Sequence, residues 1–479
     1  MLRSSTLFSF AFFAVAYGQQ IGTPEVHPPL TWESCSTSGC VAFSSSVVID
    51  ANWRDLHIVN GTTSCFERGA WNFDICTTPE VCAANCALDG ADYESTGVTT
   101  NGDELTMNFV TNSEQPNVGS RLYVMTPGSE TEYQLFHPVN REISFTVDVS
   151  NLPGGVNGAV YFTQMDADGG IARFPGNKAG AQYGTGYCDS QCPKDVKFID
   201  GVANTIDWSP SGTGSTGSCC TEMDIWEANS ISAAFASHAC TVTEQTSCTG
   251  TNCSTQGVCD QTGCEFDSFR LGNTSFYGPK KTIDTTQPFT VVTQYISSNN
   301  DSNGALSTIR RLYVQNGVII QNSETKFPGI TATNQMDATF CTQEAAALRE
   351  SDTFDTKGGF DAMTSAMNTG MILAFSIWEE SITSGVPAAT EAELSLAKVV
   401  FSEIRVGTIG ATFGNITGNG TQPSAPTTTG TATSTVSAPG ATQTIFGQCG
   451  GIGYTGPTIC PLDSTCLESN PDLSQCVPS

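Results

Sequence analysis

One stretch organises the sequence: Cys219-Cys220-Thr221-Glu222-Met223-Asp224-Ile225-Trp226-Glu227-Ala228-Asn229-Ser230, which carries three carboxylates among apolar neighbours. The apolar residues favour a β-strand, in which Glu222 and Asp224 share one face and can contact one ligand. Glu227, five residues after Glu222, would lie on the opposite face of a regular strand. Because like charges in a confined site drive one carboxyl to a raised pKa while others stay ionised, the stretch predicts a catalytic strand. A solvated strand and a fragment of a calcium-binding loop have similar spacings and are the alternatives.

Other sequence segments, far apart in the chain, add to the information in this stretch. They are His27-Pro28-Pro29-Leu30-Thr31-Trp32, Val47-Val48-Ile49-Asp50-Ala51-Asn52-Trp53-Arg54, Met165-Asp166-Ala167-Asp168-Gly169-Gly170, Gly184-Thr185-Gly186-Tyr187-Cys188-Asp189-Ser190-Gln191-Cys192-Pro193 and Leu271-Gly272-Asn273-Thr274-Ser275-Phe276-Tyr277-Gly278. Together they resemble glycoside hydrolase family 7, the fungal cellulases, from residue 19 to about residue 410. The resemblance implies an all-β fold: a curved antiparallel β-sandwich of jelly-roll, concanavalin A-like type whose concave face is a glucan-binding groove.

The resemblance also implies a role for each acid. Glu222 is the expected nucleophile, Glu227 the general acid/base and Asp224 the residue that orients and tunes Glu222, with His238 near the acid/base. A retaining glycosidase needs its two carboxyl groups about 5 Å apart, whereas five extended residues would separate the Cα atoms of Glu222 and Glu227 by roughly 16 Å. The strand must therefore bend or bulge between them. This chemistry needs no cofactor and no metal.

Neutral sugar chains are held by stacked rings and by polar groups that bond hydroxyls. The positions that match the groove of the family are Trp53, Asn157, Tyr161, Tyr187, Asp189, Gln191, Lys197, Arg270 and Trp378. Each polar member also fits a structural hydrogen-bonding role. Trp378, at the end of an apolar run, also fits the core.

Composition limits the classes of partner. The 479 residues include 19 basic and 47 acidic side chains, giving a net charge of −28. Such a surface repels phosphate backbones and anionic lipids, which argues against nucleic acid and membrane partners and favours a neutral substrate, with the chain acting as a monomer. Short alternating runs at 142–149, 289–295 and 371–378 indicate packed antiparallel sheets. Short structural helices are expected around 342–349 and 358–367.

The first 18 residues predict a secretory signal. Arg3 precedes an apolar run at 7–17 that is too short to span a bilayer, and small residues precede residue 19. An uncleaved anchor is the alternative. Twenty cysteines, an even number, favour disulfides in an oxidising compartment over metal ligands. We therefore expect a secreted, extracellular protein, with N-glycan acceptor sequences such as Asn60-Gly61-Thr62.

The family pattern implies specific cysteine pairs in the predicted catalytic domain, residues 19–412. They are 35–40, 65–86, 76–82, 188–220, 192–219, 240–259, 248–253 and 264–341. From 413 to 444 Thr, Ser, Gly, Pro and Ala dominate, which predicts an extended linker.

A second predicted module occupies residues 445–479. About 35 residues cannot form a core, so disulfides must hold them. The segment resembles a fungal family 1 carbohydrate-binding module, which implies the bridges Cys449–Cys466 and Cys460–Cys476. The expected cellulose-contacting residues are Phe446, Gln448, Asn470 and Gln475. Asp472 and Leu473 stand where such modules usually carry two further rings, so we expect weakened affinity for cellulose.

The loops depart from those of the family's cellobiohydrolases, in which long loops roof the groove into a tunnel. Here 203–219 is short, 253–259 lacks an insertion, and after Glu380 the chain reaches Ser384 within a few residues. The sequence around the carboxylates nonetheless resembles that of cellobiohydrolases more closely than that of the family's endoglucanases. The sequence predicts a secreted, retaining β-1,4-glucan hydrolase that releases cellobiose from chain ends through a partly opened tunnel. An endo-β-1,4-glucanase, a catalytically dead jelly-roll lectin and a calcium-bound structural protein are the alternatives.

Overall fold

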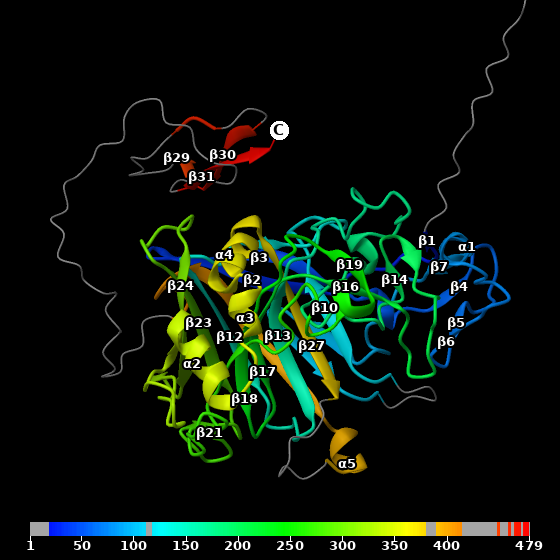
Figure 1. Cartoon of the computed structure of the whole chain (residues 1–479). Helices are drawn as coiled ribbons and strands as arrows, with labels where there is room; N and C mark the ends of the chain where they lie inside the picture. Colours follow the sequence, from blue (N-terminus) through cyan, green and yellow to red (C-terminus); the bar gives the residue numbers. More distant parts are fainter. Residues whose placement is uncertain are drawn as a thin grey trace, which may run out of the picture. The chain divides into compact units, whose positions relative to one another are not determined.

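The computed structural model of the chain describes residues 19–111, 117–379, 389–413, 448–450, 458–460, 464–470 and 473–478 (Figure 1). The chain divides into two compact units, 1–420 and 421–479. The predicted signal segment 1–18, nearly all of the predicted linker, the loop 380–388 and Phe446 lie outside the described residues. No helix in the described part of the chain combines the length and the apolar character needed to cross a bilayer.

Most elements of the first unit are strands. They are β1 (Gln20–Ile21), β2 (Pro29–Ser36), β3 (Gly39–Ile49), β4 (Leu56–Ile58), β5 (Phe66–Glu67), β6 (Ala70–Trp71), β7 (Cys86–Leu88), β8 (Val98–Asn101), β9 (Glu104–Asn108), β10 (Ser120–Val124), β11 (Leu135–Phe136), β12 (Arg141–Asp148), β13 (Val156–Thr163), β14 (Phe198–Ile199), β15 (Val202–Ala203), β16 (Thr216–Cys219), β17 (Glu222–Ala228), β18 (Ala233–His238), β19 (Thr246–Thr249), β20 (Cys264–Asp267), β21 (Tyr277–Gly278), β22 (Ile283–Asp284), β23 (Phe289–Ser297), β24 (Leu306–Gln315), β25 (Val318–Gln321), β26 (Gln335–Met336), β27 (Met371–Glu379) and β28 (Lys398–Thr408). The helices are α1 (Pro79–Asn85), α2 (Ala338–Leu348), α3 (Thr353–Thr356), α4 (Gly359–Thr369) and α5 (Glu391–Leu394), with 3-10 turns η1 (Ala51–Trp53), η2 (Ala181–Tyr183) and η3 (Gly250–Cys253).

Two large sheets form the first unit. The sheet that we call the groove sheet has the order β3–β10–β27–β13–β17–β18–β20, with every neighbouring pair antiparallel. The outer sheet has the order β9–β28–β12–β23–β24–β25, with β2 added in parallel to β28. Strand β3 pairs with β2 in the outer sheet and with β10 in the groove sheet, so it joins the two. This β-sandwich confirms the predicted fold class.

The main core lies between the two sheets. On β13, Val160 and Phe162 belong to this core, whereas Ala159 and Tyr161 belong to a smaller cluster on the other face of the groove sheet. This alternation is what a strand requires when both of its faces are covered. The outer sheet contributes residues such as Phe289 to the same core.

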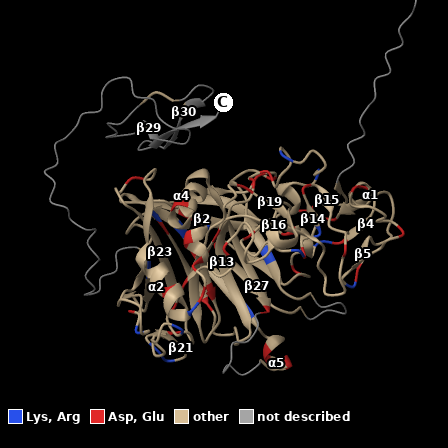
Figure 2. Cartoon of the chain, viewed as in Figure 1, with Lys and Arg blue, Asp and Glu red and all other residues tan. Residues whose placement is uncertain are grey.

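Both predicted helices are present. The segment expected at 342–349 is α2, which begins earlier, at Ala338, because the side chain of Asp337 accepts a hydrogen bond from the amide of Phe340 and caps the helix. The segment expected at 358–367 is α4, whose bounds are Gly359–Thr369. The chain has 47 acidic and 19 basic side chains, and Figure 2 marks where both kinds lie on the described elements.

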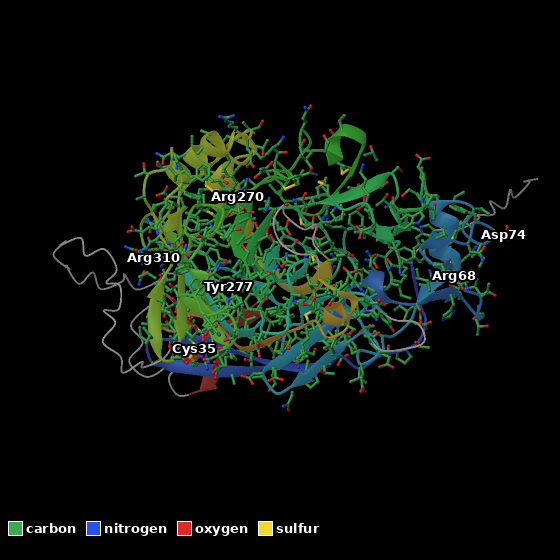
Figure 3. All side chains as sticks on the ribbon, turned by 90° about the horizontal axis from the view of Figure 1, so that it is seen from below. Cys35, Arg68, Asp74, Arg270, Tyr277 and Arg310 are labelled. Atoms are coloured by element: carbon green, nitrogen blue, oxygen red, sulfur yellow. A yellow bond between two sulfur atoms is a disulfide. The ribbon has the colours of Figure 1, made fainter. Side chains whose placement is uncertain are left out.

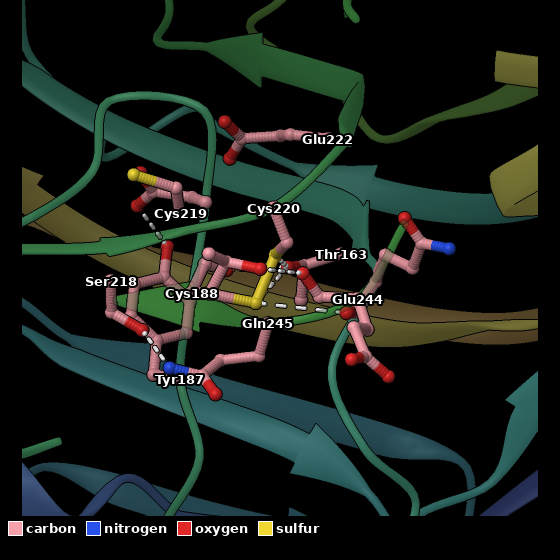
Figure 4. The surroundings of a disulfide bond; sticks show 12 residues. Thr163, Tyr187, Cys188, Ser218, Cys219, Cys220, Glu222, Glu244 and Gln245 are labelled. Carbon is pink, nitrogen blue, oxygen red and sulfur yellow. Dashed lines mark hydrogen bonds between the residues drawn. A yellow bond between two sulfur atoms is a disulfide. The ribbon is translucent and has the colours of Figure 1, made fainter. Parts of the chain in front are cut away.

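All eight disulfides expected in the first unit are present. Two of them, Cys188–Cys220 and Cys192–Cys219, tie the loop after Tyr187 to the residues that precede β17. Figure 4 shows the first of these bridges. Because these bridges flank the loop and the start of the carboxylate strand, they fix one relative to the other.

The second unit contains a small antiparallel sheet of the order β29–β31–β30, with β29 at Gln448–Gly450, β30 at Ser464–Asn470 and β31 at Leu473–Pro478. The predicted Cys449–Cys466 disulfide is present, and Cys460 is also disulfide-bonded. The side chains of Gln448, Asn470, Gln475 and Cys476 lie outside the described residues. Their predicted contacts with cellulose therefore stay predictions.

Candidate active site

A bulge interrupts β17 between the carboxylates. Against β13, Asp224 is opposite Tyr161 and Trp226 is opposite Val160, so Ile225 has no partner in the register. Against β18 the register also shifts between Asp224 and Glu227. Ile225 and Trp226 consequently both pack into the core between the sheets, although they are adjacent in sequence. One extra residue resets the parity of everything that follows it.

The bulge brings all three acids to one side of the groove sheet. Glu222, Asp224 and Glu227 line a single groove of about 430 Å³. An unbroken strand would have turned Glu227 into the core, where an unpaired carboxylate is very costly. The bend predicted from the spacing of the acids is thus confirmed.

Glu222 is held by the loop that follows Tyr187. The backbone amide of Ser190 donates to Glu222 Oε2 at 3.0 Å, and Ser190 Oγ donates to the same atom at 2.7 Å. Burial, with the negative charges of Asp224 and Asp189, raises the pKa of Glu222 well above its ordinary value. The positive charge of His238 and the bonds from Ser190 act in the opposite direction. The burial and the two negative charges outweigh these stabilising contacts, so the net shift of the Glu222 pKa is upward.

His238, at the end of β18, is paired with Glu222 in the sheet register. Its Nδ1 lies 3.0 Å from the carbonyl of Asp260, and its Nε2 lies 3.0 Å from Asp224 Oδ2. Because a carbonyl oxygen and a carboxylate oxygen both only accept hydrogen bonds, both ring nitrogens carry protons and His238 is an imidazolium. Burial alone would lower the pKa of His238, but the bond to Asp224 and the charges of Asp224 and Glu222 raise it to about 10.

Gly263 allows His238 to occupy this position. A Cβ at residue 263 would lie 2.5 Å from His238 Cε1, and the glycine has φ +82°. Only glycine adopts that backbone conformation without strain while leaving room for the ring. The imidazole is therefore clamped between its two hydrogen-bond partners and this glycine.

Glu227 follows the bulge and is contacted by β13. Asn157 Nδ2 donates to Glu227 Oε1 at 3.1 Å, and Asn157 Oδ1 accepts from the amide of Ala228 at 2.9 Å. Asn157 is itself 1% exposed. Its amide thus joins the carboxylate to the backbone of the same strand, which limits the orientations open to Glu227.

A second polar group lies beside Glu222. The hydroxyl of Tyr187 donates to Asp189 Oδ2 at 2.6 Å and lies 3.2 Å from the hydroxyl of Tyr161. Burial raises the pKa of Asp189 to about 6, against the bond from Tyr187. The guanidinium of Arg121 stacks on the Tyr187 ring, 3.2 Å from its centroid. These groups offer hydroxyl, carboxylate and cationic contacts to a sugar.

The structure gathers most of the residues expected in the groove. Trp53, Tyr161, Tyr187, Asp189, Gln191, Trp378 and His238 line it together with the three acids. Trp378 is 41% exposed, so it does not belong to the core. Trp53 is partly buried, and its Nε1 donates to the carbonyl of Val118 at 3.3 Å.

Three further expected residues are not among those that line the groove within the described chain. Asn157 lies behind Glu227, as described above. Lys197 Nζ donates to the carbonyl of Asn52 at 2.7 Å, next to Trp53, and burial lowers its pKa to about 8. Arg270, which is labelled in Figure 3, forms ion pairs with Glu265, at 3.1 Å, and with Glu350. Asn157 and Lys197 thus support the groove from behind.

Several residues of the groove and its surroundings are not among those that the sequence predicts for the site. Arg121, Asp195, Gln261 and Glu265 line the groove, and Ser190 binds Glu222. Glu265 is on β20, where it pairs with Ala236, which in turn pairs with Asp224. Recognising such residues requires the strand order.

Metal ligands are not available where cysteines gather. In the described part of the chain the closest groups of such ligands are built on cysteines, for example Cys76, Cys82 and Cys86. These sulfurs are already used in disulfides. The groove itself is lined by carboxylates, an imidazole, hydroxyls and aromatic rings.

Comparison with known proteins agrees with this geometry. The chain matches the family model described as Glycosyl hydrolase family 7 over residues 19–383, and that of a fungal cellulose binding domain over 445–471. Among solved structures it is similar to a family 7 cellobiohydrolase from Daphnia pulex, with 40% identity, a TM-score of 0.79, and coverage of 82% of this chain and 99% of that one. It is also similar to a cellobiohydrolase from Melanocarpus albomyces complexed with cellotetraose, with 38% identity, a TM-score of 0.76, and coverage of 82% of this chain and 99% of that one. The Humicola insolens endocellulase EGI is similar, with 33% identity, a TM-score of 0.72, and coverage of 82% of this chain and 100% of that one.

The β-sandwich and its groove of acids and rings define a glycoside hydrolase that acts on a polysaccharide. More specifically, the chain belongs to glycosyl hydrolase family 7 and is a cellulase with a C-terminal fungal cellulose-binding domain.

Proposed function

We propose that this cellulase cleaves β-1,4-glucosidic bonds with retention of configuration, with Glu222 as the nucleophile and Glu227 as the general acid/base. The observation that carries the proposal is the bulge at Ile225, because it turns both glutamates into the groove, where the glucan would bind. Asp224 lies between them on the same strand.

The reaction is a double displacement in two steps. In the first, a carboxylate oxygen of Glu222 attacks the anomeric carbon while Glu227 gives its proton to the glycosidic oxygen. The carbon–oxygen bond breaks, the shortened glucan leaves as an alcohol, and a glycosyl ester remains on Glu222. In the second, water attacks the anomeric carbon and gives its proton to Glu227. Glu222 leaves as a carboxylate, so both residues return to their starting states.

The neighbours of Glu222 prepare it to attack. Its burial opposes ionisation, but Ser190 donates two hydrogen bonds to one carboxylate oxygen, and His238 supplies a positive charge nearby. Asp224 keeps His238 protonated and oriented through the 3.0 Å contact. We infer that Asp224 and His238 act together to fix the geometry and the charge of the nucleophile.

Substrate contacts come from rings and hydroxyls. Trp53 and Trp378 present ring surfaces in the groove, and Tyr161, Asp189 and Gln191 present polar groups. A neutral glucan offers ring faces and hydroxyls but no charge, which suits this combination. Arg270 serves the groove through Glu265, one of its lining residues.

The cutting mode that we propose is release of cellobiose from chain ends through a partly opened tunnel. The higher identity to two cellobiohydrolases than to an endocellulase supports it. The alternative, internal cutting, is favoured by the short segment 204–215 between β15 and β16 and by η3, which the Cys248–Cys253 bridge closes tightly. Viscosity and soluble reducing ends measured together on carboxymethyl-cellulose separate the two, since a rapid fall in viscosity indicates internal cutting.

We further propose that the protein is secreted, with residues 1–18 as its signal and 413–444 as a linker between the hydrolase, 19–412, and the module, 445–479. Its many disulfides support an oxidising compartment. The module binds cellulose weakly because Asp472 and Leu473 replace rings. In the full chain, Asp472→Tyr should then increase retention on microcrystalline cellulose, and unchanged retention would contradict this assignment.

The roles of the two glutamates are tested with two aryl cellobiosides. Dinitrophenolate leaves without a proton, whereas phenol needs one, so Glu227→Gln should lower kcat/KM on the phenyl substrate about 100-fold or more and change it little on the dinitrophenyl substrate. Glu222→Gln should abolish turnover of both. Equal losses for Glu227→Gln on the two substrates would refute its role as the acid.

A further inference from the structure

We propose that Arg311 is a positioning residue that holds the bulge of β17 and thereby sets the position of Glu227. The inference rests on the proposed function of Glu227 as acid/base and assigns a role to a side chain of the opposite sheet, which does not reach the groove.

Arg311 is on β24 in the outer sheet, and its side chain crosses the core. It is 1% exposed. Its Nη2 donates to the carbonyl of Ile225, the bulge residue, and its Nε donates to Thr293 Oγ1 at 3.1 Å. The guanidinium lies 4.3 Å from the centroid of the Phe235 ring, on the strand that flanks β17.

The bulge needs such a partner. Ile225 is out of register with β13 and falls within the shifted part of the pairing with β18. A backbone carbonyl directed into an apolar core costs free energy unless a donor reaches it. Arg311 provides a charged donor, which forms a stronger hydrogen bond than a neutral one.

The cost of burying Arg311 supports a specific role. The partners of its guanidinium are a carbonyl, a hydroxyl and aromatic rings, all of which are uncharged. Burial lowers its pKa, which shows the same cost. Apolar residues of similar volume are often as stable or more stable at such positions. The residue is better explained by what its guanidinium binds, the Ile225 carbonyl, than by core stability.

Loss of Arg311 should affect the residue that follows the bulge, Glu227, and not those that precede it. Glu222 and Asp224 precede it and stay paired with His238 and Ala236 on β18. Glu227 follows it, so its direction depends on the extra residue. Displacement of a catalytic group by about 1 Å can cost about 100-fold in rate. Loss of Arg311 is therefore expected to impair protonation of the leaving group while sparing the attack by Glu222.

The test uses the same two aryl cellobiosides with Arg311→Met. We expect kcat/KM on phenyl cellobioside to fall by about 10- to 100-fold, with a much smaller change on the dinitrophenyl substrate and partial recovery in Arg311→Lys. The control is Arg310→Met, because consecutive side chains of a strand face opposite sides of the sheet and Arg310 is only partly buried. Arg310 is labelled in Figure 3. This control variant should leave both values unchanged.

Thr293→Val provides a second variant if Arg311→Met does not fold. It removes only the hydroxyl that accepts from Arg311 Nε and should shift the ratio of the two kcat/KM values in the same direction by a smaller factor. Equal losses on both substrates in Arg311→Met, or an unchanged ratio in Thr293→Val, would overturn the proposal. Glu227→Gln separates failure of this inference from failure of the proposed function. If Glu227→Gln selectively lowers kcat/KM on the phenyl substrate and the Arg311 variants do not, the role of Arg311 is refuted and that of Glu227 stands.

Discussion

The hydrogen bond from Ser190 Oγ to Glu222 predicts a shift in the pH dependence of activity when it is removed. The bond stabilises the ionised form of a carboxyl whose pKa is already raised by burial and by Asp224 and Asp189. Ser190→Ala therefore raises that pKa further. A hydrogen bond to a charged group contributes about 1.5–3 kcal/mol, but the backbone amide of Ser190 still donates at 3.0 Å. We take about 1.4 kcal/mol, which corresponds to about one pH unit.

The assay is the pH profile of kcat/KM on a soluble chromogenic cellobioside, which reports groups of the free enzyme. The acidic limb should move upward by about one unit in Ser190→Ala. The control is Ser218→Ala, because the hydroxyl of Ser218 accepts from the amide of Gln245 (Figure 4). That variant should keep the profile of the parent protein. A stationary limb in Ser190→Ala, or a shift to lower pH, would refute the reasoning.

Three other perturbations follow from the same structure. Asp224→Asn removes the negative charge beside Glu222 and also weakens the protonation of His238; because the charge of Asp224 has the larger effect on Glu222, the acidic limb should move to lower pH, which the same profile measures. For Glu25, burial is outweighed by the bonds to Arg54, so its pKa is lowered to about 2. Glu25→Gln should lower the free energy of unfolding in urea by about 3–5 kcal/mol at pH 6. Because the folded-state pKa is depressed, this difference should be complete above pH 4.5 and shrink as the pH falls toward 2; a constant difference would contradict it. Trp378→Ala should lower kcat/KM on cello-oligosaccharides about fivefold without changing the melting temperature, since the ring is 41% exposed.

The carboxylate strand shows how far sequence reasoning reaches. The spacing of Glu222, Asp224 and Glu227 could not place three acids on one face of a regular strand, so a bend was required, and the bulge at Ile225 provides it. The cysteine pairs followed from the family pattern, and the short alternating runs predicted the sandwich. The sequence leaves open whether Trp378 belongs to the core or to the groove, because an apolar run continues to its position, and its exposure in the structure decides for the groove.

The remaining site residues depend on contacts that no local pattern encodes. Ser190 reaches Glu222 across 32 residues of sequence, and Arg311 reaches Ile225 across 86. Arg121 is placed by its stacking on Tyr187 and by Asp50, 71 residues away. Such contacts arise from strand order and from the disulfides that hold the loops, and these are fixed only when the sheets assemble.

The most direct measurement is the configuration of the first product. Proton NMR spectra recorded during the first minutes of cello-oligosaccharide hydrolysis distinguish the two anomers before mutarotation mixes them. Attack by Glu222 followed by attack of water predicts that the β-anomer is formed first. If the α-anomer appears first, water attacks the substrate directly, and the assignment of Glu222 as nucleophile is contradicted.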